Sequence, residues 1–286
     1  MQIAQSIEDL RRFLKPAKQR SFVPTMGNLH AGHLELVKVA KQTLPEATCV
    51  ASIFVNRLQF APHEDFDSYP RTFAKDCELL EAQGCDVVFA PQEKDLYPEP
   101  QVFKVHPPAE LADILEGAFR PGFFVGVSTV VHKLFNCVQP DVAVFGKKDY
   151  QQLMVIKRMV QQMALPIHIV GVDTLRADDG LALSSRNGYL SAEERARAVE
   201  LSGALKHMVI SVRDNLSKPS GDVTKVVAQI EDHAMQTLRD KGWQPDYMTV
   251  RHQHDLSTVT QFSDLPLVVL GAARLGSTRL IDNLEI

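Results

Sequence analysis

Short apolar runs alternate with helical patterns along the first 172 residues of this chain, and this order limits the possible folds more than any other feature. One apolar run that suits a strand ends at Gly27. The others cover residues 48–55, 85–90, 141–146 and 167–172. A short amphipathic segment covers residues 7–14, helices are expected at about 34–43, 72–83, 127–138 and 147–163, and the proline-rich stretch 91–108 is typical of a loop. Strands that alternate with helices form βαβ units. The sequence therefore predicts an α/β domain with a Rossmann-like, mostly parallel sheet covered on both faces.

The pattern changes after Val172. A polar, glycine-ended loop is followed by two expected helices, at about 191–216 and 223–241, and by strand-like runs at 247–251, 267–270 and 279–284. Helices that precede a group of short strands indicate a smaller α+β domain. We therefore expect an N-terminal domain of residues 1–178 and a C-terminal domain of residues 179–286.

The composition limits the function. With 286 residues, 45% of them hydrophobic and 23% charged, the chain resembles a globular protein with room for two domains. Its formal net charge of −4 argues against a general nucleic-acid binder. The sequence has no run long enough to span a bilayer and no secretory pattern at its start, so we expect a cytoplasmic protein without a membrane partner. The cysteines match no zinc or redox spacing and are expected to be buried, reduced and structural (Cys49, Cys77, Cys85, Cys137).

Two histidines, His30 and His33, lie where the first strand meets the following helix. A helix N-terminus has unpaired N–H groups and partial positive charge, which suit an anion such as phosphate. The imidazoles add hydrogen bonds or positive charge there, and Gly32 lets a nucleotide approach the backbone closely. Taken alone, the His-x-Gly-His pattern is more typical of ordinary loop and first-turn histidines.

Two further clusters suit phosphate. The segment Gly146-Lys147-Lys148-Asp149 joins a strand to a helix. A lysine of this segment is suited to bind phosphate oxygens, and Asp149 is suited to help bind Mg²⁺. In Ser184-Ser185-Arg186, two hydroxyls and a guanidinium lie on a loop between the expected domains. Each cluster has a structural alternative, a solvated helix start for the first and a capping turn for the second.

Together the three clusters favour nucleotide binding, because ligands of parallel α/β sheets sit at the carboxyl ends of the strands. The chain has neither a Gly-x-Gly-x-x-Gly fingerprint nor a Walker A lysine motif. Gln59 and Gln152 follow two other strands, and their neutral amides suit the hydroxyl or carboxylate of a small substrate. Glutamines that are merely exposed are the alternative.

Ordered motifs extend over nearly the whole chain. They are Pro24-Thr-Met-Gly-Asn-Leu-His-Ala-Gly-His33, Ser52-Ile-Phe-Val-Asn56, Gln59-Phe60, Tyr69-Pro-Arg-Thr72, Phe145-Gly146, Lys148-Asp-Tyr-Gln-Gln152, Asp179-Gly-Leu-Ala-Leu-Ser-Ser-Arg-Asn187, Ala273-Arg-Leu-Gly276 and Arg279-Leu-Ile-Asp-Asn283. With these motifs in this order, the chain resembles the pantothenate synthetase (pantoate–β-alanine ligase) family. More widely, it is similar to nucleotidylyltransferases with a HIGH-type turn, here His30-Ala-Gly-His33, and a KMSKS-like loop, here Ser184-Ser185-Arg186.

The resemblance implies a two-step ligation. The carboxylate of pantoate attacks the α-phosphorus of MgATP, which releases pyrophosphate and forms pantoyl adenylate. The amine of β-alanine then attacks the acyl carbon and releases AMP. ATP is thus a co-substrate that is accompanied by Mg²⁺, and no protein nucleophile is required. Family members are typically homodimers, so a second copy of the chain is the expected protein partner.

The resemblance also implies residue roles. His33 is the catalytic proton donor, and His30, Lys148 and Arg186 complete the catalytic group. Gln59 and Gln152 hold pantoate, Asn56 supports that pocket, and Asp149 is the candidate metal ligand. The residues expected to contact ATP are Met26, Gly27, Asn28, Leu29, His30, Ala31, Gly32, His33, Gly146, Lys147, Lys148, Asp149, Leu175, Leu183, Ser184, Ser185 and Arg186.

Four positions depart from the family pattern. Arg57 stands where the family usually has Pro, and Lys147 stands where it usually has Glu. Phe123 replaces the usual His of an Arg-Pro-x-His-Phe segment, and Val125 replaces an Arg that is found in some relatives. Arg57 and Lys147 are expected to add positive charge near a phosphate site and to alter affinity or its salt dependence.

Two alternatives to the ligase remain open at this level. The first is a nucleotidylyltransferase that stops at a nucleotide-linked product; the Gln59/Gln152 pair with Asn56 suits a small hydroxy acid better than a phosphate substrate. The second is a non-catalytic nucleotide-binding regulator, in which damaged catalytic positions are expected. Both histidines, Lys148 and Arg186 are present.

Overall fold

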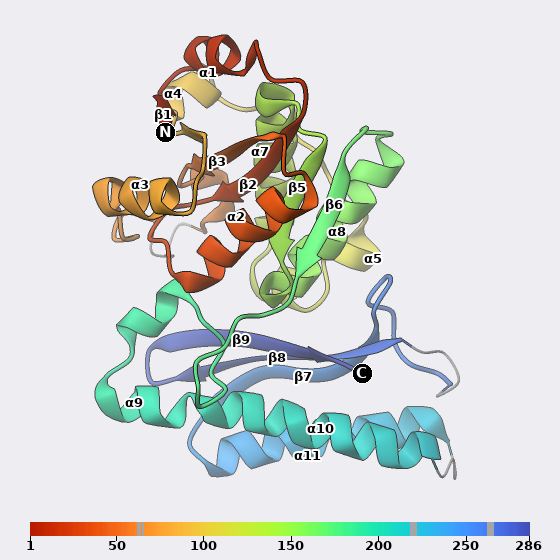
Figure 1. Cartoon of the computed structure of the whole chain (residues 1–286). Coiled ribbons are helices and arrows are strands. Elements are labelled where there is room, and N and C mark those ends of the chain that lie inside the picture. Colours follow the sequence, from red (N-terminus) through yellow and green to blue (C-terminus); the bar gives the residue numbers. More distant parts are fainter. Residues whose placement is uncertain (62–63, 65, 218–221, 262–265) are drawn as a thin grey trace. The chain divides into compact units, whose positions relative to one another are not determined.

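The computed structural model describes residues 1–61, 64, 66–217, 222–261 and 266–286, and its contacts divide the chain into two compact units (Figure 1). The first unit comprises Met1–Lys147 and Gln152–Leu175. The second comprises Arg176–Ile286 together with the short segment Lys148–Gln151. The functional division into residues 1–178 and 179–286 stays a prediction.

The first unit contains the parallel sheet that the alternation predicts. Its strand order is β1-β4-β3-β2-β5-β6, and every neighbouring pair is parallel. The strands are β1 (Gln2–Ala4), β2 (Arg20–Thr25), β3 (Thr48–Ile53), β4 (Val87–Phe89), β5 (Val142–Gly146) and β6 (His168–Val172). The edge strand β1 has only three residues, too few to form a recognisable sequence pattern, and was not anticipated.

The helical elements of this unit include α1 (Ile7–Leu14), α2 (Ala31–Thr43), η1 (Arg57–Gln59), α3 (Phe73–Ala82), α4 (Glu93–Leu96), α5 (Ala109–Ala112), α6 (Glu116–Phe119), α7 (Phe123–Val138), η2 (Lys147–Asp149) and α8 (Tyr150–Gln162). Helix α7 begins four residues before the predicted start at residue 127. Its N-cap, Gly122, has φ +83°, a conformation that glycine adopts without strain. The proline-rich stretch also contains one four-residue helix, α4.

Apolar side chains cover both faces of the sheet. On β2, Phe22 packs edge-on against Phe135 of α7, and its neighbour Val23 belongs to a cluster with Val37 of α2 and Leu80 of α3. Successive strand residues point to opposite faces, so one strand supports both helical layers. Figure 1 shows α2 lying across β2 and β5.

The strand order places a topological switch next to β2. From β2 the chain proceeds to β3 and β4 on one side and later returns to add β5 and β6 on the other. Ligands of open parallel sheets bind outside the carboxyl ends of the strands at such a switch. The two-histidine turn follows β2, and the segment beginning at Lys147 follows β5, so both leave the sheet at this point.

The second unit is an α+β structure, as expected. Its antiparallel sheet has the order β7-β8-β9, formed by β7 (Gln244–His252), β8 (Leu267–Leu275) and β9 (Thr278–Glu285). Helices α10 (Val199–Ser217) and α11 (Val223–Asp240) lie side by side along it (Figure 1). The single helix expected at 191–216 is two helices, because α9 (Ala192–Arg197) ends at Ala198. Segment Ser185–Tyr189 forms the 3-10 turn η3.

The four cysteines are free thiols, of which Cys49, Cys85 and Cys137 are buried as expected. Cys77 is partly exposed, because it lies beside the buried face of α3 rather than on it. Among the residues that the structure describes, no helix is both long and apolar enough to cross a membrane.

Candidate active site

The turn after β2 has an unusual backbone. Gly27 and Asn28 have φ values of +85° and +51°, so two consecutive residues lie in the left-handed region. Thr25 fixes the start of the turn, because its hydroxyl donates to the carbonyl of Ser52 at 2.7 Å and accepts the N–H of Gly27 at 3.2 Å. The chain thereby turns sharply between the end of β2 and the start of α2.

A buried carboxylate holds the turn in place. Asp76 of α3 is 1% exposed and accepts the N–H of Asn28 at 2.9 Å and that of Leu29 at 2.8 Å. The hydroxyl of Thr72 also donates to this carboxylate, at 3.1 Å. A buried charge is tolerated only when it is hydrogen-bonded, so Asp76 and the turn stabilise each other.

Asp76 is not among the site residues predicted from the sequence. The signal that was available is its position on the buried face of α3, four residues before Leu80. A charged residue on the apolar face of a helix indicates a polar partner elsewhere in the fold.

The two histidines cap α2. Nδ1 of His30 accepts the N–H of Gly32 at 3.1 Å, and Nδ1 of His33 accepts the N–H of His30 at 3.3 Å. A ring nitrogen that accepts a backbone N–H carries no proton, so each neutral imidazole has its proton on Nε2. The ring centroids are 4.1 Å apart, and both side chains are partly exposed. The capping role and the functional role are therefore compatible, because the cap fixes which nitrogen donates.

The first turn of α2 suits an anion. It contains no acidic residue, and the helix dipole favours negative charge at this end of the helix. At Gly32 a β-carbon would lie 2.9 Å from Cε1 of His30, so only glycine leaves the capping ring undisturbed. Met26, Ala31 and Leu29 complete the turn; Leu29 is buried and the other two are accessible.

Asn56 and Gln59 meet at the end of β3. Asn56 is fully buried, and its Nδ2 donates to Oε1 of Gln59 at 3.0 Å and to the carbonyl of Gly126 at 3.2 Å. Its Oδ1 accepts the hydroxyl of Tyr97 at 2.9 Å. Both ends of the Asn56 amide are thus used inside the protein, and the bond to Gln59 directs the Nε2 donor of Gln59 away from Asn56. Burial raises the pKa of Tyr97, and the carboxylate of Glu93 adds to that shift, so its hydroxyl remains a donor.

Gln59 lines a cavity of about 420 Å³ in the first unit. Arg120 forms part of its wall, and its guanidinium donates to both oxygens of Glu64, at 2.6 and 2.8 Å. The ring of Phe123 lies 3.8 Å from the guanidinium carbon of Arg120, a stacking geometry with favourable cation–π character. This departure from the usual His therefore keeps a planar ring against the arginine. The other lining residues include Leu58, Phe60, Ala61, Lys104, His106, Pro121, Gly122, Val125, Gly126 and Thr129.

The added charges expected at Arg57 and Lys147 are both paired. Lys147 lies 2.8 Å from Asp173, which follows β6, and Arg57 lies 3.4 Å from Glu93 and stacks on Phe66. Each of the two added cations therefore has a carboxylate close to it. Close to Lys147, Gly146 ends β5 and Gln152 lies in the first turns of α8, both partly exposed. Leu175 is exposed at the end of the unit.

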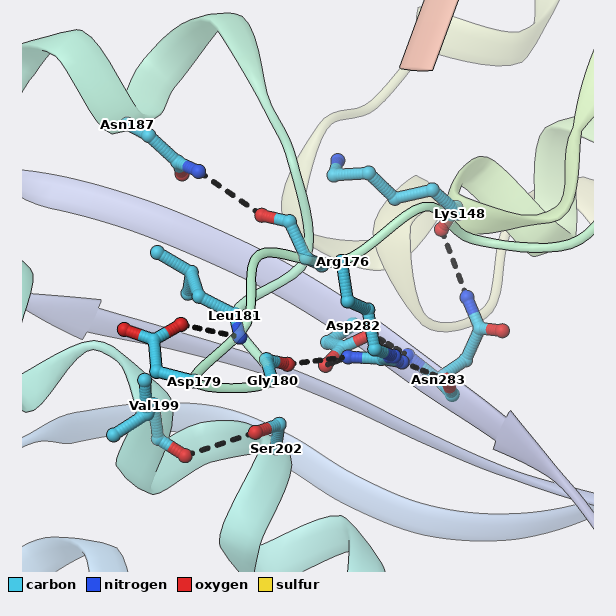
Figure 2. Close-up of polar contacts among 11 residues, drawn as sticks. Lys148, Arg176, Asp179, Gly180, Leu181, Asn187, Val199, Ser202, Asp282 and Asn283 are labelled. Atoms are coloured by element: carbon cyan, nitrogen blue, oxygen red, sulfur yellow. Dashed lines mark hydrogen bonds and ion pairs between the residues drawn. The ribbon is translucent and has the colours of Figure 1, made fainter. Parts of the chain in front are cut away.

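The remaining predicted residues belong to the second unit. Figure 2 shows Lys148 and the segment around Arg176. Arg176 and Ala182 form an antiparallel bridge that closes a short hairpin, and Leu183–Arg186 follow it directly. Ser184 caps η3 by accepting the N–H of Arg186 at 3.2 Å, so the capping turn considered from the sequence is present. Leu183, Ser184, Ser185 and Arg186 are all partly exposed, which leaves this loop accessible to a ligand as well.

Asp149 is exposed, and within the described residues no three His, Cys, Asp or Glu side chains cluster as a metal cage would require. Mg²⁺ usually keeps several waters and is held by substrate phosphates with one or two carboxylates. A single accessible aspartate fits that mode of binding and does not fit an all-protein cage.

Comparison with known proteins agrees with this geometry. A family model described as "Pantoate-beta-alanine ligase" matches residues 2–285. Two curated proteins named "Pantothenate synthetase" are similar over their whole length: the one from Leptothrix cholodnii is 59% identical over a 293-residue alignment, and the one from Verminephrobacter eiseniae is 60% identical over 290; each alignment covers 100% of both chains.

Solved structures show the same similarity. The crystal structure of pantothenate synthetase from Thermus thermophilus is 42% identical, with a TM-score of 0.88 and 99% of both chains covered. A pantoate–β-alanine ligase from Francisella tularensis, described as complexed with "Beta-gamma ATP and Beta-alanine", is 31% identical with a TM-score of 0.74, covering 99% of this chain and 97% of that one. This chain therefore belongs to the pantoate–β-alanine ligase family.

Proposed function

We propose that this enzyme condenses pantoate with β-alanine at the expense of ATP, through a pantoyl-adenylate intermediate. The observation that carries the proposal is the two-histidine turn: two Nε2–H donors and a helix N-terminus without acidic residues lie beside the switch point of a parallel sheet. Full-length similarity to the ligase family supplies the identity of the substrates.

In the first step, a carboxylate oxygen of pantoate forms a bond to the α-phosphorus of ATP, and the bond from that phosphorus to the bridging oxygen breaks. Negative charge grows on the departing pyrophosphate. A donor aimed at oxygens where charge develops stabilises the transition state more than the ground state. We assign this work to the Nε2–H groups of His33 and His30, which donate hydrogen bonds to these oxygens.

In the second step, the amine of β-alanine attacks the acyl carbon of the adenylate, AMP leaves, and the amine loses a proton as the amide forms. The Nε2 donor of Gln59, oriented by Asn56, is assigned to pantoate, together with Gln152. Asn56 acts by orienting Gln59, since its own amide is engaged inside the protein. The cavity beside Gln59 contains Lys104 and His106, whose cationic forms suit the carboxylate of β-alanine.

Similarity to the family assigns further side chains to the polyphosphate. We assign to this role the side chains of Lys148 and Arg186 and the hydroxyls of Ser184 and Ser185. Their support is the residue chemistry, the accessibility of the loop and the similarity to the family. Mg²⁺ would be held mainly by ATP, with Asp149 as the candidate protein ligand, and would neutralise phosphate charge.

We further propose that the protein acts in the cytoplasm as a homodimer. Resemblance to the family supports both statements, and one surface feature supports the second. Val102 and Phe103 are neighbours that are 79% and 88% exposed, and adjacent exposed apolar side chains are typical of a protein contact. Light scattering on the purified protein tests this: a mass of one chain at micromolar concentration would contradict it.

One assay tests the reaction itself. With pantoate present, labelled pyrophosphate should exchange into ATP in the absence of β-alanine, because adenylate formation is reversible. Addition of β-alanine should then produce AMP and pantothenate in equal amounts. A folded protein that shows no pantoate-dependent exchange would exclude the adenylate route, and AMP release without pantoate would indicate a different acceptor.

A further inference from the structure

The C-terminal strand β9 contacts the segment that follows β5. Within the second unit, Nδ2 of Asn283 donates to the main-chain carbonyl of Lys148 at 2.8 Å. Two residues further along each segment, the hydroxyl of Tyr150 donates to Oε1 of Glu285 at 3.0 Å. Figure 2 shows the Lys148 carbonyl facing Asn283 while the lysine side chain extends away from it. The strand thus fixes the main chain of Lys148, from which the ammonium side chain extends.

The preceding residue of β9, Asp282, contacts a different segment. Its carboxylate is 4% exposed and binds Arg176 through two parallel bonds of 2.8 Å, one from each outer nitrogen. The same two nitrogens also donate to the carbonyls of Gly180 and Asn283, both at 3.1 Å. All four outer N–H groups of the guanidinium are therefore engaged, which defines the position of Arg176 closely.

Arg176 in turn fixes the hairpin that precedes the serine loop. Its bond to Gly180 spans the turn of the hairpin, and the bridge from Arg176 to Ala182 closes it. The amide of Asn187, just beyond the loop, donates to the carbonyl of Ala182 at 3.0 Å. Residues 183–186 thus lie between Ala182, which is bridged to Arg176, and Asn187, whose side chain is bonded back to Ala182.

We propose that Asp282 and Asn283 of β9 form one positioning element that sets the backbone of Lys148 and the Ser184–Arg186 loop relative to each other. Neither side chain touches substrate; they act through the residues assigned to the polyphosphate, and the proposal rests on that assignment. Adjacent strand residues point to opposite sides, so one dipeptide reaches both segments. When a side chain that stabilises the transition state is misplaced by about 1 Å, the rate falls by up to about 100-fold. Loss of the contacts from β9 should therefore slow the reaction.

The test is a double-mutant cycle between Asn283→Ala and Lys148→Ala, read by pantoate-dependent pyrophosphate exchange at saturating and subsaturating ATP. If Asn283 acts through Lys148, its removal should slow exchange about tenfold in the native background and less than twofold when Lys148 is already alanine. Tyr150→Phe, which removes the second contact to β9 and keeps the ring, should show the same dependence on Lys148.

Asn215→Ala is the matched control. Its Nδ2 also donates to a main-chain carbonyl at 2.8 Å, that of Ser211, in the same unit but within α10. It should leave exchange within twofold of the native rate. A parallel cycle of Asp282→Asn with Arg186→Ala tests the other link in the same way.

The outcomes distinguish failure of the positioning role of Asn283 from failure of the role assigned to Lys148. Equal slowing by Asn283→Ala in both backgrounds, or no slowing at all, would overturn the positioning role. Native exchange by Lys148→Ala alone would instead remove the role assigned to Lys148, independently of Asn283. Urea unfolding of each variant shows that the comparison is made between folded proteins.

Discussion

Asp76→Asn is the substitution that most directly tests how the two-histidine turn is held. The carboxylate of Asp76 receives two main-chain N–H groups, from Asn28 and Leu29, at 2.9 and 2.8 Å. Asparagine has nearly the same shape but offers only one acceptor oxygen, and its NH₂ group must face one of these N–H groups. The substitution therefore removes the charge and one acceptor without creating a cavity.

The magnitude follows from these contacts. A hydrogen bond to a charged group contributes about 1.5–3 kcal/mol, and an unsatisfied buried N–H costs about 1–3 kcal/mol. Asn28 is also held at φ +51°, a conformation that needs support from its surroundings. We expect the variant to lose about 3–4 kcal/mol of its free energy of unfolding. Because the turn relaxes, kcat/KM for ATP should also fall by at least about tenfold.

The assay combines urea unfolding with pyrophosphate exchange at varied ATP. Asp141→Asn is the control, because that carboxylate also accepts a main-chain N–H, from Arg20 at 2.8 Å, but at the opposite end of the strands. It should reduce stability without a change in kcat/KM for ATP. If Asp76→Asn kept native stability and native ATP kinetics, the idea that this carboxylate holds the turn would be refuted.

Three further substitutions follow from the same geometry. Gly32→Ala should raise the KM for ATP about tenfold, because the new β-carbon displaces the His30 cap; Gly203→Ala, which meets no neighbour within 4 Å, should leave the kinetics unchanged. Lys104→Ala should raise the KM for β-alanine and not that for ATP, if its cavity takes the β-alanine carboxylate. Lys147→Glu should lower stability by less than about 1 kcal/mol in urea, since its partner carboxylate is 88% exposed. Its exchange rate should stay within about twofold of the native rate at physiological salt.

Much of the fold could be predicted because it rests on local patterns. The parallel sheet, the helices that cover it and the α+β character of the C-terminal part follow from apolar periodicity and are confirmed. The three-residue strand β1 was missed because so short an element leaves no periodicity. The break between α9 and α10 was missed because Ala198, an excellent helix former, gives no stop signal.

The site was predictable to a smaller extent. Residue chemistry at strand ends predicted a phosphate site at the histidine turn, and the resemblance implied the other site residues; these roles stay predictions. Asp76 was not found, and Asp282 and Asn283 were noted only as part of a motif, because their contacts join segments 47 to 135 residues apart. The carboxylates beside Arg57 and Lys147 were not predicted for the same reason, since the fold brings Glu93 and Asp173 beside them, and the effect of these residues on affinity stays a prediction. Long-range polar partners leave no periodic trace in a sequence.

The central claim is that adenylate formation depends on the two-histidine turn, and His33→Ala tests it most directly. Nδ1 of His33 accepts one N–H at 3.3 Å, and the side chain is partly exposed, so the variant should remain folded with an unfolding free energy within about 1 kcal/mol of the native value. Loss of one donor to a developing oxyanion usually slows a reaction by about 10²–10³. We predict a loss of this size in pantoate-dependent pyrophosphate exchange by the folded variant. Exchange at close to the native rate would contradict the account.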